Sequence, residues 1–65
     1  NMTGNRIKEA REAANMTQAE LAERAGITRV SLSRIETGAN PNPSVQTAIR
    51  IAKTLGVSMD FLFLQ

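Results

Sequence analysis

Cysteine and histidine are both absent from this sequence of 65 residues, and so are tryptophan and tyrosine. Without cysteine the chain forms no disulfide, and without cysteine or histidine it lacks the usual ligands of a zinc site. Histidine, cysteine and tyrosine are also common general bases and nucleophiles. Asp60 is the only aspartate, and no glycine-rich phosphate loop accompanies the glutamates. We therefore expect no catalysis, no metal, no cofactor and no small-molecule substrate.

Long apolar runs are absent as well. No stretch approaches the roughly 20 apolar residues that cross a bilayer, and the sequence does not begin with the basic and apolar regions of a signal peptide. Together with the lack of cysteine, these features predict a soluble, cytoplasmic protein that does not act on membranes. The length fits one domain over residues 1–65, which buries only about 60% of the surface of its unfolded chain. A second subunit would therefore add useful stability.

Positive charge is concentrated in one segment. The net charge is only +2, but residues 24–35 hold three arginines and no acid, whereas four glutamates lie within residues 9–23. This asymmetry is typical of a local surface that meets an anionic partner. A solvated helix face would explain the same pattern, so the surrounding motif has to decide between the two interpretations.

Apolar residues recur with the 3.6-residue period of helices, and strand-like alternation is nearly absent, which predicts an all-α fold of five helices. The first helix is expected at residues 5–14, with Asn15 in a left-handed conformation at its end. Thr17 should begin the second helix through a capping box with Glu20, and Gly26 should end it. The residues expected on the inner side of these two helices are Ile7, Ala10, Ala14, Leu21, Ala22 and Ala25.

The remaining helices have equally clear boundaries in the sequence. Thr28 should cap the third helix, which continues through Glu36 before Thr37 and Gly38 end it, and Ser44 should cap the fourth, which ends at Gly56. Ser58 should cap a short fifth helix. The core positions expected in the third and fourth helices are Leu32, Ile35, Val45, Ala48, Ile51, Ala52 and Leu55.

Residues 17–38 predict a helix, a tight turn that contains a glycine, and a second helix. This arrangement presents the second helix to the major groove of DNA in many DNA-binding proteins. Ala22 and Gly26 permit close approach of the two helices, and Ile27 adds apolar surface at the turn. The segment is therefore interpreted as a helix-turn-helix.

The same segment resembles the phage repressor and Cro, or XRE-type, family, whose members commonly show TQxELAxxxGxxxxxxSxxExG. RIKEAR before it and NPSVQTAIRIAKTLGVSMDFL after it resemble the first, fourth and fifth helices of that family, so nearly the whole chain is covered. The resemblance implies a lambda-repressor-like domain that binds double-stranded DNA and regulates transcription, most often as a repressor. The matching positions are Thr17, Gln18, Glu20, Leu21, Ala22, Gly26, Ser33, Glu36 and Gly38.

The third helix separates into two faces when it is laid out at about 100° per residue. Leu32 and Ile35 point one way. Arginine can pair with guanine O6 and N7, serine can donate or accept a hydrogen bond, and valine methyls suit the thymine methyl. The opposite face is therefore expected to read bases, through Arg29, Val30, Ser33 and Arg34.

Phosphate contacts are expected around this face. Gln18 resembles the phosphate-contacting glutamine of the family, and the free amides at a helix start also favour an anion. Relatives often carry lysine or arginine in the loop after the third helix, but residues 39–43 have no charge. This departure predicts a weak dependence of DNA binding on salt. The other residues expected at phosphates are Thr28, Asn40, Asn42 and Arg6.

The resemblance also implies an ion pair between Arg11 and Glu36, which would bridge the first helix and the end of the third. We interpret this pair as structural. If it were fully exposed, it would contribute only about 0 to 1 kcal/mol.

The fifth helix carries more apolar surface than one face of a short helix buries within its own subunit. We expect a homodimer that associates through this helix and sets the two third helices about 34 Å apart on a pseudo-palindromic operator. The alternative is a protein-interaction or antitoxin-type helix-turn-helix module, although a pure interaction module has no need of the basic face. The residues expected at the dimer interface are Met59, Phe61, Phe63 and Leu64.

Overall fold

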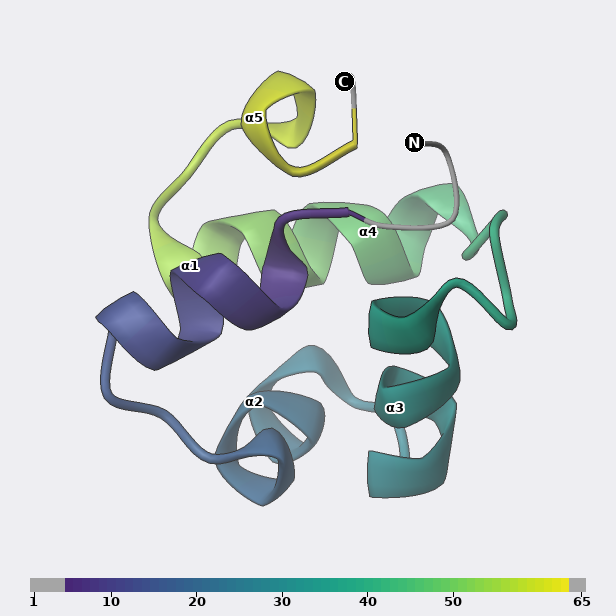
Figure 1. The fold of residues 1–65 in the computed structure, drawn as a ribbon, viewed down its shortest axis with the longest axis horizontal. Helices are drawn as coiled ribbons and strands as arrows, with labels where there is room; N and C mark the ends of the chain where they lie inside the picture. The colour runs from purple at the N-terminus through teal and green to yellow at the C-terminus, as the bar shows by residue number, and fades with distance from the viewer. Residues whose placement is uncertain (1–4, 64–65) are drawn as a thin grey trace.

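The computed structural model describes residues 5–63, which form five helices and no strand (Figure 1). The all-α prediction is therefore confirmed. None of the helices in this part of the chain has the length and apolarity that crossing a membrane requires. The helices are α1 (Ile7–Ala13), α2 (Gln18–Ala25), α3 (Arg29–Thr37), α4 (Val45–Leu55) and α5 (Met59–Phe63).

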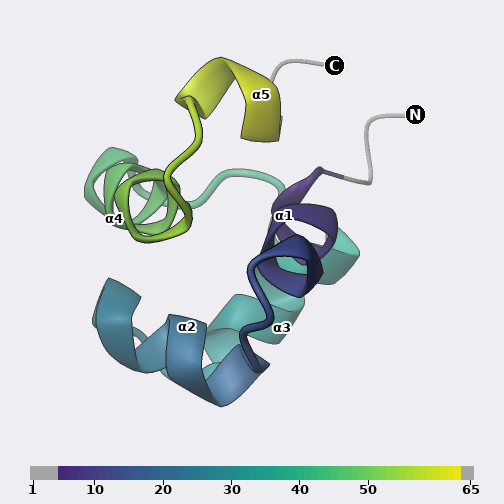
Figure 2. The same cartoon turned by 90° about the vertical axis from the view of Figure 1, so that its left-hand side faces the viewer.

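Helix α4 lies at the centre of the packing. It contacts α1, α2 and α5, and α2 also packs on α3. In Figures 1 and 2, α2 and most of α3 lie on one side of α1 and α4, whereas α5 lies on the other. The core between them contains fully buried aliphatic side chains from every helix: Ile7, Leu21, Leu32, Ile35, Ile51 and Leu62.

Side-chain caps start α2, α3, α4 and α5 at the residues that the sequence predicts, whereas α1 begins at Ile7, later than the expected residue 5, and has no side-chain cap from its N-cap residue. At α2, Thr17 Oγ1 accepts a hydrogen bond from the Glu20 amide at 3.1 Å, and Glu20 Oε1 accepts one from the Thr17 amide at 2.8 Å. The hydrogen bond from the Thr17 amide lowers the pKa of the Glu20 carboxyl below its ordinary value, since it stabilises the charged form. Thr28, Ser44 and Ser58 accept equivalent bonds at the starts of α3, α4 and α5.

Two residues that were expected in the core are on the surface. Ala14 is exposed because α1 ends at Ala13, and Asn15 follows in the predicted left-handed conformation, with φ of 57°. Val45 is 71% exposed. It is the first residue of α4, and the buried residues of that helix begin only at Ala48. Helical periodicity predicts which face of a helix a residue lies on. It does not predict whether other helices pack over the ends of that helix.

The turn between α2 and α3 depends on Gly26, which has φ of 75°. A Cβ atom at this position would lie 2.9 Å from Nη1 of Arg50, a residue of α4. The Arg50 guanidinium therefore lies against the turn and brings positive charge to the C-terminal end of α2, where it is favourable.

We expect Gly26→Ala to lower the free energy of unfolding by at least about 1 kcal/mol. The strain of a left-handed alanine exceeds the entropy that alanine removes from the unfolded chain, and Arg50 must also move. Gly56→Ala is the matched control, because Gly56 has φ of 70° but open space around the position of its Cβ. In urea unfolding, Gly56→Ala should lower the free energy of unfolding by no more than Gly26→Ala does. A Gly26→Ala variant as stable as the wild type would contradict this account of the turn.

Candidate nucleic-acid interface

Helix α3 separates into a buried side and an open side, as its sequence predicts. Leu32 and Ile35 are 0% and 2% exposed, whereas Val30 is 68% exposed. Arg29 and Arg34 are also exposed. The period of 3.6 residues produces this division, because positions three and four apart share a face.

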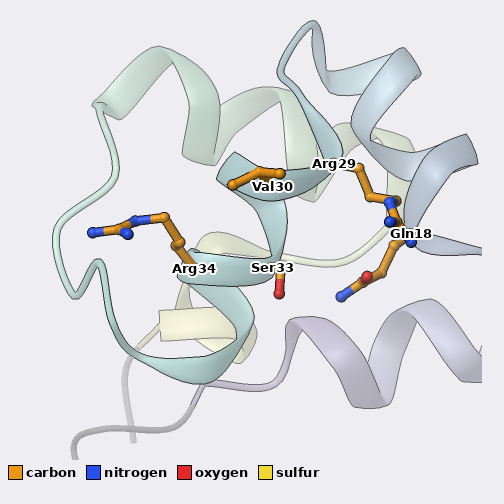
Figure 3. A pocket seen from close by; sticks show the side chains of 5 residues that line it. All are labelled: Gln18, Arg29, Val30, Ser33 and Arg34. Atoms are coloured by element: carbon orange, nitrogen blue, oxygen red, sulfur yellow. The ribbon is translucent and has the colours of Figure 1, made fainter.

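The side chains on the open side of α3 surround a shallow hollow of about 300 Å³. Figure 3 shows that Gln18 approaches it from α2, while the other four side chains project from α3. None of the five lining residues is acidic and two are arginines, so the local field favours an anion. The lining residues are Gln18, Arg29, Val30, Ser33 and Arg34, the same side chains that the sequence places together.

The loop after α3 is held to the end of that helix. The Asn40 amide donates to the Arg34 carbonyl at 2.9 Å, and the Asn42 amide donates to Asn40 Oδ1 at 3.2 Å. Asn40 is therefore half-buried and shapes the loop, whereas Asn42 is exposed. In Figure 3 the side chain of Arg34 points toward this loop, so the open side of α3 continues into it.

Two other expected phosphate contacts have roles within the fold. Thr28 is exposed, and its hydroxyl accepts the Ser31 amide at 3.0 Å. The Arg6 guanidinium lies 4.9 Å from the centre of the Phe61 ring, which is a cation–π arrangement. Arg6 is nevertheless exposed, so its guanidinium stays accessible to solvent while it contacts the ring.

Arg11 and Glu36 form the ion pair that the family resemblance implies, and the pair is buried. Arg11 Nε donates to Glu36 Oε2 at 2.8 Å, and Arg11 Nη2 donates to Oε1 at 3.3 Å. The exposed fractions of the two side chains are 11% and 4%. The estimate for an exposed pair therefore does not apply here. Arg11 Nη1 also donates to the Met16 carbonyl at 2.9 Å, which fixes the entry to α2.

Two side chains, those of Gln18 and Asn5, form long-range hydrogen bonds that the sequence does not predict. Gln18 Nε2 donates to Glu36 Oε1 at 3.0 Å. Asn5 Nδ2 donates to the Ile35 carbonyl at 2.8 Å, while Asn5 Oδ1 accepts the Ile7 amide at the start of α1. The bonds to Glu36 and to the Ile35 carbonyl join residues far apart in the sequence. The only signal was an asparagine before a helix and a glutamine at a helix start, and neither identifies its long-range partner.

The apolar residues of α5 divide between the core and the surface. Leu62 is fully buried, whereas Met59, Phe61 and Phe63 pack against the core and stay partly exposed. Leu64, the fourth residue expected at a dimer interface, lies outside the described residues. Beside Phe61 there is a second hollow of about 330 Å³, lined by Glu9, Ala10, Ala13, Ala14, Leu55, Val57 and Phe61.

Known proteins share both the sequence pattern and the fold. The helix-turn-helix family model matches residues 7–62. The HTH-type transcriptional regulator SinR of Bacillus subtilis is 39% identical over 61 residues, which are 94% of this chain and 55% of SinR. The chain therefore spans about half the length of that relative.

Solved structures of two similar proteins contain DNA. The P22 c2 repressor in complex with a synthetic operator has a TM-score of 0.88 and 26% identity, covering 98% of this chain and 96% of that chain. SinR, described as the master regulator for biofilm formation, has a TM-score of 0.81 and 40% identity in its complex with DNA, covering 89% of this chain and 92% of that chain. These matches confirm the predicted lambda-repressor-like fold and the resemblance to phage repressors.

We expect Arg11→Met to lower the free energy of unfolding by about 3 kcal/mol, because it leaves a buried carboxylate without its countercharge. The double variant Arg11→Met/Glu36→Leu should recover at least half of this loss, since it removes both charges. Arg24→Met is the control, because Arg24 is exposed and its loss should cost less than about 0.5 kcal/mol. Urea unfolding measures all three variants. Equal losses for Arg11→Met and Arg24→Met would show that the ion pair is not important for stability.

Proposed function

This chain belongs to the helix-turn-helix family, and from that premise we propose that it is a sequence-specific, DNA-binding transcriptional regulator that acts in the cytoplasm. Helix α3 enters the major groove and reads base edges. One observation carries the proposal. Gln18 and four side chains of α3, two of them arginines, line one open hollow, at the position where proteins of this architecture meet DNA. We propose no catalytic activity, in keeping with the lack of histidine, cysteine and tyrosine.

The chemistry of the open face suits base recognition. Arg29 and Arg34 can each form two hydrogen bonds to guanine O6 and N7. Val30 is the most exposed large apolar residue of α3, and its methyls can contact the methyl of thymine. Ser33 lies between the two arginines in sequence and is half-buried, so its hydroxyl can donate or accept near the floor of the groove.

Contacts to phosphate would set the register of the protein on the duplex. Gln18 stands at the first turn of α2, where backbone amides are free and anions are favoured. Asn42 is exposed in the loop after α3, and its amide group can reach phosphate without releasing a counterion. The proposed set of phosphate contacts is completed by Thr28, Asn40 and Arg6.

We further propose that two copies bind one operator, with α5 and the residues beside it between them. The partly exposed Met59, Phe61 and Phe63, together with the hollow beside Phe61, support this surface. Leu64 completes the proposed interface. Two third helices about 34 Å apart would then contact successive turns of the same groove. Repression would follow where the operator overlaps a promoter.

A protein-interaction or antitoxin-type module is the second candidate function. The apolar hollow between α1, the end of α4 and α5 favours it, because such a surface suits a partner protein. This role is compatible with DNA binding, since the hollow and the open face of α3 share no lining residue. A chain that binds a protein but shows no preference among duplexes would have this function alone.

The experiment that tests the proposal is selection of bound duplexes from a random library, followed by binding of the selected site at several salt concentrations. We expect an inverted repeat with half-sites about one turn apart. A single half-site would contradict the dimer but not sequence-specific binding. Recovery of no preferred sequence at low ionic strength would contradict the proposed function itself.

On the selected site, Arg34→Ala should weaken binding by about 1 to 3 kcal/mol and relax the preference at one base position. Arg24→Ala is the matched control, because it removes the same side chain from an exposed position of α2 that does not line the hollow. It should weaken all duplexes slightly and equally. If Arg34→Ala also weakened every duplex by the same factor, its assignment to base readout would be wrong.

A further inference from the structure

Glu36 accepts hydrogen bonds from two different helices. Its Oε2 atom accepts Arg11 Nε at 2.8 Å, and its Oε1 atom accepts both Arg11 Nη2 at 3.3 Å and Gln18 Nε2 at 3.0 Å. Its side chain is only 4% exposed. Every buried side-chain nitrogen and oxygen atom among residues 5–63 has a hydrogen-bond partner. The carboxylate is therefore part of a fully satisfied network, in which each hydrogen bond has a definite direction.

The bond from Gln18 restricts a side chain that would otherwise be mobile. An unrestrained glutamine has three rotatable torsions, and ordering them on binding has an entropic cost. Gln18 has already undergone this ordering in the folded chain, because one Nε2–H points at Glu36. Its amide is planar, so the same bond restricts the directions open to the second Nε2–H. That donor belongs to a residue lining the hollow on the open face.

From this geometry we infer that Glu36 is a positioning residue for DNA binding: it orients the Gln18 amide toward a phosphate without touching DNA itself. The inference rests on the proposed function. It assigns to Glu36 a role beyond the stability of the ion pair, and it links the orientation of Gln18 to α1 through Arg11.

Two features of glutamate suit this position. A carboxylate has two acceptor oxygens and no donor, so it can accept from Arg11 and Gln18 at once. A glutamine at residue 36 would offer one oxygen, and its NH₂ group would face one of the two donors. The negative charge of Glu36 would repel a nearby phosphate, but the Arg11 guanidinium compensates this charge, with Arg11 Nε 2.8 Å from Glu36 Oε2. Arg11 thereby allows a carboxylate to lie behind a surface that binds an anion.

A double-mutant cycle of Gln18→Ala and Glu36→Gln on the selected duplex tests the inference. Each single variant should weaken binding by about 10-fold, the scale of one hydrogen bond to a charged group. The double variant should bind within about twofold of Glu36→Gln, because Gln18 contributes little once it is not oriented. Binding is measured at a temperature where circular dichroism shows that all four proteins are folded.

Two further variants separate positioning from general damage to the fold. Arg34→Ala should keep its full effect in the Glu36→Gln background, and Glu36→Gln should weaken all duplexes by one factor without changing base preference. Glu12→Gln removes the same charge from an exposed position of α1, and it should change affinity by less than about twofold, in line with its lack of a buried partner. If Arg34→Ala also lost its effect in that background, the role of Glu36 would be structural and the inference wrong.

A measurement on the wild type keeps the inference testable if Glu36→Gln does not fold. The side-chain NH₂ group of Gln18 should have a clearly higher ¹⁵N order parameter than that of Gln46, an exposed glutamine of α4. Equal order parameters would overturn the inference. It would also be overturned if Gln18→Ala weakened DNA binding by the same factor in the wild type and in the Glu36→Gln variant.

If the wild type binds no duplex, the proposed function fails and this inference fails with it. If the wild type binds but the cycle is additive, only this inference fails.

Discussion

The buried ion pair between Arg11 and Glu36 is the constraint on which the arrangement of the first three helices depends. Removal of a carboxylate from water is costly unless a countercharge and hydrogen bonds replace the water. Arg11 supplies both, with a separation of 2.8 Å, and it also donates to the Met16 carbonyl at the entry to α2. One guanidinium thus connects α1, the start of α2 and the end of α3. These segments cannot move apart without exposing an unpaired charge to the apolar core.

The constraint acts at one end of α3 and leaves its open side free. Asn5 adds a second tie at the same end through the Ile35 carbonyl, and Leu32 anchors the middle of the helix in the core. The arginines on the opposite side are exposed. A helix held in this way presents its side chains at fixed positions, so a partner does not have to order the backbone on binding. This rigidity suits recognition of a DNA groove, whose donors and acceptors are themselves fixed.

The features that could be predicted from sequence are those set by neighbouring residues. The Thr17–Glu20 capping box spans three residues, and the two faces of α3 follow from its period, so both are visible without a structure. The Gln18–Glu36 hydrogen bond was not predictable, because it depends on the angle between α2 and α3. The burial of the ion pair was missed for the same reason. Even the exposure of Val45 depends on which neighbouring helix reaches the end of α4.

The most direct test of this account is a map of backbone amide shifts on addition of the selected duplex, with the Arg11 Nε–H signal followed in the same spectra. We expect the largest shifts at Gln18 and at residues 29–34, and an Arg11 Nε–H that exchanges slowly with and without DNA. This view of the ion pair and the open face of α3 would be contradicted if the largest amide shifts occurred at the hollow beside Phe61. It would also be contradicted if the Arg11 Nε–H exchanged as fast as that of Arg24.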